Sequence, residues 1–130
     1  MNRRDFTKNK ATLILRMIAD GHEPVEDYLF RSTQEQQRLF AIGREKQPDG
    51  TWKIIDEKII VTKNDGIKNP SDHQYCKAID IYFVVTNPDG SVFVDYDYEK
   101  TADLAIKYHD VWVSMGGKPM IAWDNPHYGC

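Results

Sequence analysis

Residues 71–80 have the sequence SDHQYCKAID, and the rest of the chain is organised around them. This stretch places the imidazole of His73 and the carboxylate of Asp80 seven residues apart, where a polar loop runs into an apolar strand. Near the C-terminus, the carboxylate of Asp124 is followed three residues later by a second imidazole, that of His127. Because imidazole nitrogens and carboxylate oxygens are common zinc ligands, we predict a zinc site formed by His73, Asp80 and His127.

The residues that follow predict a β-strand over residues 78–85. Successive side chains of a strand point to opposite faces. One face would carry Ile79, Ile81, Phe83 and Val85, and the other Ala78, Asp80, Tyr82 and Val84. Asp80 therefore points away from the most apolar face. The turn sequence NPDG at residues 87–90 leads to residues 92–96 and predicts an antiparallel hairpin.

Three segments have the apolar periodicity of helices. Residues 6–20 form the first, which Gly21 ends. The second begins at the capping-box sequence STQE of residues 32–35 and runs to about Ile42, with Gly43 as its stop. The third covers residues 99–115, and on it we expect the side chain of His109 to be exposed.

Two more apolar runs predict strands. Residues 58–62, KIIVT, are rich in β-branched side chains, and residues 119–123, PMIAW, would form a last strand that presents Asp124 and His127. We therefore expect an α+β fold in which a small, mainly antiparallel sheet packs against three helices. The sheet would contain residues 58–62, 78–85, 92–96 and 119–123.

The composition predicts one domain over residues 1–130, because a chain of 130 residues that is 41% hydrophobic can bury its own core. Its net charge of -3 comes from interspersed charges rather than a basic stripe, so we expect no nucleic-acid partner. We also expect a monomer. We expect no signal peptide, and no apolar run approaches the ~20 residues that span a bilayer. We therefore expect that the protein is made in the cytoplasm and has no membrane partner.

The two cysteines, Cys76 and Cys130, are expected to be free thiols, because domains that depend on disulfides usually carry more. Their spacing leaves an alternative open. Each cysteine lies three residues after a predicted histidine ligand, so His73, Cys76, His127 and Cys130 could together hold a closed structural zinc ion.

Two sequence patterns together resemble one family. The order S-x-H-x-x-G-x-A-x-D, followed much later by D-x-P-H, is similar to that of the M15 zinc peptidases. These are D-alanyl-D-alanine carboxypeptidases and dipeptidases, and the L-alanyl-D-glutamate endopeptidases found as phage endolysins. Residues 30–44 also resemble the family's aromatic-Arg-Ser segment, glutamine-rich helix and Gly-Arg ending, so the resemblance spans residues 30–128. Cys76 stands where the family has glycine.

The resemblance implies a Hedgehog/DD-peptidase-like fold and a role for each polar residue. Asp124 would be the general base that takes a proton from the zinc-activated water and returns it to the leaving amine. Arg31 would clamp a substrate carboxylate through its planar guanidinium. Ser71 would support the developing negative charge, and Gln36 would hold the peptide.

The predicted function is zinc-dependent hydrolysis of a peptidoglycan stem peptide. A small single domain without a signal sequence looks most like an endolysin that cuts between L-Ala and D-Glu, made in an infected bacterium and acting on the wall after release. The first alternative is a D-Ala-D-Ala carboxypeptidase or dipeptidase. The second is a non-enzymatic protein stabilised by zinc through Cys76 and Cys130.

Overall fold

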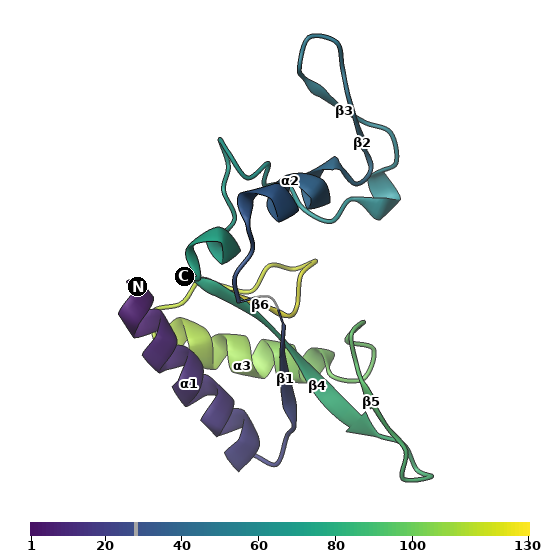
Figure 1. Cartoon of the computed structure of the whole chain (residues 1–130). Helices are drawn as coiled ribbons and strands as arrows, with labels where there is room; N and C mark the ends of the chain where they lie inside the picture. Colours follow the sequence, from purple (N-terminus) through teal and green to yellow (C-terminus); the bar gives the residue numbers. More distant parts are fainter. Residues whose placement is uncertain (28) are drawn as a thin grey trace.

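Strand β4 (Ala78–Thr86) is the centre of the main sheet (Figure 1). It pairs in antiparallel orientation with β1 (Pro24–Asp27), β5 (Val92–Val94) and β6 (His127–Gly129). The computed structural model describes residues 1–27 and 29–130. The structure within these ranges confirms an α+β protein with three helices and a small antiparallel sheet.

The alternation predicted for β4 is confirmed. Ile79, Ile81 and Phe83 are at most 1% exposed and belong to the hydrophobic core. Asp80 and Tyr82, on the other face of the strand, line a cavity. One strand therefore divides the molecule into a packed side and a side that is available for chemistry.

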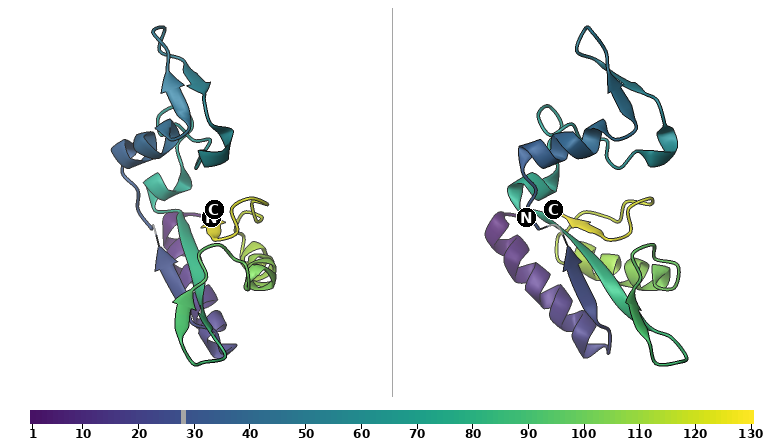
Figure 2. Two further views of the ribbon diagram at one scale, coloured as in Figure 1. Left: turned by 90° about the vertical axis from the view of Figure 1, so that its right-hand side faces the viewer. Right: turned by 45° about the vertical axis from the view of Figure 1, so that its right-hand side comes forward.

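Helices α1 (Arg3–Ala19) and α3 (Ala102–Ser114) supply the rest of the core, which lies between them and the sheet (Figure 2). Trp112 of α3 is its largest member and packs edge-on against Phe6 of α1 and Tyr128 of β6. The helices predicted at residues 6–20 and 99–115 are thus present, with bounds shifted by up to three residues. No helix of the described ranges is both long and apolar enough to cross a membrane.

The prediction that His109 is exposed is wrong, because its side chain is only 3% exposed. The imidazole stacks on the ring of Tyr128 at a centroid distance of 4.0 Å. Its Nδ1 lies 2.7 Å from the carbonyl oxygen of Ala105, and its Nε2 lies 3.0 Å from that of His127. Because α3 packs against β6, a wider face of the helix is buried than the helical periodicity of the sequence predicts.

Residues 33–59 form an arm that projects away from the main sheet (Figures 1 and 2). It contains α2 (Thr33–Ala41), a hairpin of β2 (Arg44–Lys46) and β3 (Trp52–Ile54), and the 3-10 helix η1 (Glu57–Ile59). As predicted, Ser32 caps α2 by accepting a hydrogen bond from the backbone N–H of Glu35 at 3.1 Å. Gly43 follows the helix with a φ of +80°, and a Cβ there would lie 2.6 Å from the carbonyl oxygen of Asp56. Only glycine fits this position.

The strand predicted at residues 58–62 is wrong. Asp56 accepts a hydrogen bond from the backbone N–H of Lys58 at 3.1 Å and starts η1 instead. Ile59 and Val61 are 52% and 48% exposed, so no strand or core in the described part of the chain supports the β-branched run. Strand propensity depends on such packing, and the local side-chain hydrogen bond prevails here.

The strand predicted at residues 119–123 is also wrong. A single bridge between Ile121 and Asp124 closes a turn, and the last strand, β6, begins only at His127. The edge of β4 is occupied by residues 127–129, which leaves Trp123 61% exposed. Strand β1 was not predicted, since it starts with proline and ends with two acidic residues.

Candidate metal centre

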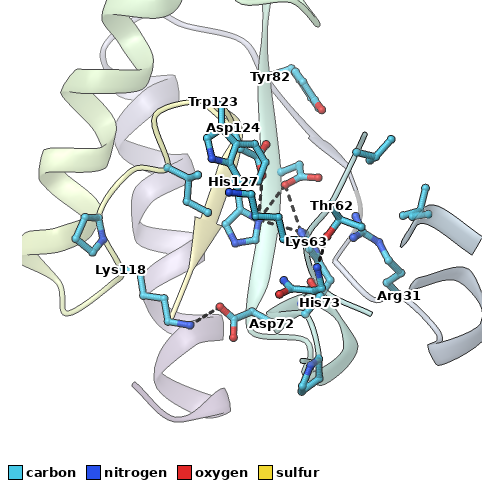
Figure 3. A pocket seen from close by; sticks show the side chains of 18 residues that line it. Arg31, Thr62, Lys63, Asp72, His73, Tyr82, Lys118, Trp123, Asp124 and His127 are labelled. Carbon is cyan, nitrogen blue, oxygen red and sulfur yellow. Dashed lines mark hydrogen bonds and ion pairs between the residues drawn. The ribbon is translucent and has the colours of Figure 1, made fainter. Parts of the chain in front are cut away.

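Two pieces of local structure bring the three predicted ligands together. Asp80 and His127 are direct partners in the β4–β6 ladder, so their side chains project from the same face of the sheet. His73 comes from the 3-10 helix η2 (Asp72–Tyr75), which lies immediately before β4. The chain thus folds so that two side chains 54 residues apart in sequence face one carboxylate (Figure 3).

The donor atoms of these side chains form a small triangle. Nε2 of His73 lies 3.2 Å from Nδ1 of His127, and the Oδ1 of Asp80 lies 3.3 Å and 3.6 Å from these two nitrogens. Zinc bonds of about 2.0–2.1 Å to tetrahedral ligands require the ligands to be roughly 3.3–3.4 Å apart. His73, Asp80 and His127 can therefore hold a metal ion as one face of a tetrahedron.

The electrostatics of the triangle suit a cation. Burial of Asp80 opposes ionisation, but the imidazoles of His127 and His73 outweigh it and lower the pKa of the carboxyl group to about 2. Among the described residues, the buried Oδ1 of Asp80 has no hydrogen-bond donor of good geometry. Buried carboxylate oxygens are normally satisfied, so a cation at the centre of the triangle would supply the missing interaction.

Asp124 lies beside the triangle without being part of it. Its Oδ2 is 4.0 Å from Nδ1 of His127, farther than the three edges described above. Burial raises the pKa of Asp124; the His127 imidazole opposes the shift, and the Asp80 carboxylate adds to it. A carboxylate with a raised pKa next to a metal centre has the property that a general base requires near neutral pH.

Arg31 and Gln36 form a unit on the arm side of the centre. The backbone N–H of Arg31 donates to the carbonyl oxygen of His73 at 3.1 Å, and its Nη1 donates to Oε1 of Gln36 at 2.9 Å. Gln36 is fully buried, and its amide nitrogen donates to the carbonyl oxygen of Asn64 at 2.8 Å. Arg31 lines the cavity, whereas Gln36 lies behind it and orients the guanidinium. The direct contact between Gln36 and substrate that the resemblance implies has no support in this geometry.

Ser71 lines the cavity and also fixes His73. Its hydroxyl accepts a hydrogen bond from the backbone N–H of His73 at 3.3 Å. The backbone N–H of Ser71 in turn donates to Oε1 of Gln74 at 2.9 Å. This is a capping box, and it sets the start of η2. Ser71 thus positions the first ligand, and its predicted contact with substrate stays a prediction.

The triangle opens into a cavity of about 760 Å³ between the sheet and the arm (Figure 3). Its lining adds residues to which sequence reasoning gave no role: Lys63, Asp72, Tyr82, Lys118 and Trp123. Tyr82 and Asp72 had a signal in the sequence, because Tyr82 lies two residues after Asp80 on the same face of β4 and Asp72 directly precedes His73 in η2. Lys63, Lys118 and Trp123 come from irregular segments whose positions depend on the tertiary fold.

The cysteines do not take part in the centre. Among the described residues, the group that could hold a metal contains His73, Asp80 and His127 and neither sulfur. Both cysteines are free thiols, as predicted, and the Sγ of Cys130 lies 3.7 Å from the backbone oxygen of Met1. The closed site of two histidines and two cysteines is therefore not formed.

Cys76 occupies a position that favours glycine. It ends η2 with φ 53° and ψ 43°, the left-handed conformation. That conformation costs a non-glycine residue about 1–2 kcal/mol. Glycine avoids this cost, but it makes the unfolded chain more flexible, which lowers the stability of the folded state by about 0.4–1 kcal/mol. We expect Cys76→Gly to raise the free energy of unfolding by about 0.5–1 kcal/mol, measured by urea unfolding of the zinc-free protein. Cys76→Ala keeps the strain and should give no such gain; a loss of stability in Cys76→Gly would contradict this account.

Comparison with known proteins adds no relative. The chain matches no protein-family model, and no curated protein matches it. Function is therefore inferred from the residues of the centre and their geometry.

Proposed function

We propose that the protein is a zinc peptidase that hydrolyses the L-Ala–D-Glu bond of peptidoglycan stem peptides. The observation that carries this proposal is the triangle of His73, Asp80 and His127, which opens on a large cavity beside Asp124. The family resemblance of residues 30–128 supports it, and a fold of the Hedgehog/DD-peptidase type and an endolysin made inside an infected bacterium belong to the same proposal.

Zinc fits the donor set, since two imidazoles and one carboxylate are a common catalytic combination that leaves a fourth position open. Zinc held in this way supplies a Lewis acid and a water nucleophile at neutral pH. Asp124 takes the proton from the attacking water and delivers it to the leaving amine. Arg31, held by Gln36, binds a carboxylate of the substrate with two parallel donors.

Tyr82 is suited to stabilise the negative charge that develops on the attacked carbonyl oxygen. It lies two residues beyond Asp80 on β4 and lines the cavity. Burial, and after it the charge of Asp80, raise the pKa of its hydroxyl group, so that it stays a hydrogen-bond donor throughout the working pH range. Such a donor is used where a transition state carries an oxyanion.

Tyr82→Phe is expected to lower kcat by about 10²-fold, the usual effect of removing one oxyanion donor. Zinc content and thermal stability should stay close to those of the wild type. Tyr96→Phe is a matched control, because Tyr96 packs edge-on against Tyr82 with centroids 4.9 Å apart but does not line the cavity. Equal kcat values for Tyr82→Phe and the wild type would exclude this role.

Mass spectrometry of peptidoglycan digested by the zinc-loaded protein tests the function and identifies the bond. New L-Ala carboxyl ends and D-Glu amino ends are the expected products. Free D-Ala would instead show a D-Ala-D-Ala carboxypeptidase or dipeptidase. No product of either kind would exclude a peptidoglycan peptidase and leave a zinc-binding protein without this activity.

A further inference from the structure

A second cavity adjoins the metal cavity on the side of the arm. Its volume is about 500 Å³, and its apolar lining comes from Ile54 of β3, Ile60, Val61 and Trp123. Val61, Thr62, Lys63 and Trp123 line both cavities, so the two share one boundary. The space beside the metal centre therefore continues past Trp123 onto the arm.

The apolar side chains of the second cavity are unusually open to solvent. Ile54 is 52% exposed, Val61 is 48% exposed and Trp123 is 61% exposed. Polar groups adjoin them: the Nζ of Lys63 lies over the Trp123 ring, 5.8 Å from its centroid, and Arg44 and Glu57 line the same cavity. A flat indole and an aliphatic floor, with hydrogen-bonding groups at the edge, match a ring that is apolar on its face and polar on its rim.

A sugar ring has this character, and the chemistry of the substrate places sugars close to the metal. In peptidoglycan, L-Ala is joined directly to the lactyl group of muramic acid. One extended residue spans about 3.5 Å, so a bond cut after L-Ala leaves the glycan strand within one residue of the metal. Cleavage between the two terminal D-Ala residues would put the sugars four residues away, at about 14 Å or more.

We propose that the cavity at Ile54, Val61 and Trp123 is a subsite for the glycan strand of peptidoglycan, with the indole of Trp123 stacked on a sugar ring. This inference rests on the function proposed above, since it takes the bond after L-Ala as the one that is cut. This cavity thereby recognises the polymer, and the metal centre acts on the peptide next to it. Sugar-bearing stem peptides are consequently better substrates than the same peptides without sugars.

The first test measures binding without hydrolysis. Short soluble glycan strands, stripped of their peptides by an amidase, are titrated into zinc-loaded protein by calorimetry at high salt, where attraction between Lys63 and lactyl carboxylates is screened. The wild type is expected to bind the strands, and Trp123→Ala to bind them about tenfold more weakly. Trp52→Ala is the matched control: Trp52 is 41% exposed and lies on the arm, but it packs on Phe40 and lines neither of these two cavities.

The second test compares kcat/KM for a stem peptide with and without its disaccharide. The wild type should prefer the sugar-bearing form about tenfold, and Trp123→Ala should lose that preference.

Failure of strand binding by the wild type, or equal losses in Trp52→Ala and Trp123→Ala, would overturn the subsite. A preference for longer sugar-free peptides that depends on Trp123 would assign the cavity to peptide and overturn it as well. The two proposals fail separately. Strand binding without hydrolysis would exclude the peptidase activity and keep the glycan subsite. Hydrolysis without sugar preference would exclude the subsite and keep the peptidase activity.

Discussion

Loss of zinc is expected to abolish peptide hydrolysis and to lower the melting temperature by about 15 °C, because ligand at 1,000 times its Kd adds about 4 kcal/mol to the stability of the folded state. His73→Ala and His127→Ala should each prevent this gain. Each removes one corner of a triangle whose edges are 3.2, 3.3 and 3.6 Å. The measurements are zinc content per chain and melting curves with zinc and with a chelator.

The chelator separates metal binding from packing. His73 is 2% exposed, so His73→Ala also leaves a cavity and lowers stability without any metal. The decisive quantity is therefore the difference in melting temperature between zinc and chelator for each variant. His22→Ala, which changes a histidine outside the centre, should keep that difference. Full zinc occupancy in His73→Ala or His127→Ala would show that the residue is not a ligand.

The positions of His73 and Asp80 could be predicted from the sequence because they depend on short-range pattern, whereas His127 is brought to Asp80 by the long-range pairing of β4 with β6. The two-residue period of β4 sends Asp80 away from Ile79 and Ile81 whatever the rest of the chain does. Ser71 caps the turn that carries His73 through groups that are adjacent in sequence. These local rules agree with the final fold, as they do where a sequence specifies its structure strongly.

The errors occurred where tertiary contacts decide. Residues 58–62 have the composition of a strand, yet no strand of residues 1–27 or 29–130 pairs with them, and the Asp56 cap turns the chain into η1. His109 was judged from α3 alone, although β6 covers it with the ring of Tyr128. The role of Gln36 in holding the peptide came from the family resemblance and stays a prediction, and the structure adds that its amide hydrogen-bonds to Arg31 and Asn64. No local pattern carries that information.

Asp124→Asn is expected to retain zinc and the fold while lowering peptide hydrolysis by about 10²–10⁴-fold, the usual contribution of a positioned general base. The amide keeps the shape of the side chain but cannot accept a proton. The carboxylate lies 4.0 Å from Nδ1 of His127 and outside the ligand triangle, so metal binding should survive the change.

The pH dependence gives a second readout for the same residue. A general base works only when ionised, and burial raises the pKa of Asp124 above that of an ordinary aspartate. Activity of the wild type should therefore fall on the acid side as Asp124 becomes protonated, and the residual activity of Asp124→Asn should lack that step. Asp72→Asn is a control that should keep the acid-side step. Asp72 lines the same cavity, but its carboxylate is paired with Lys118 at 2.6 Å. Wild-type activity in Asp124→Asn would exclude Asp124 as the base, whereas loss of zinc in this variant would make it a fourth ligand.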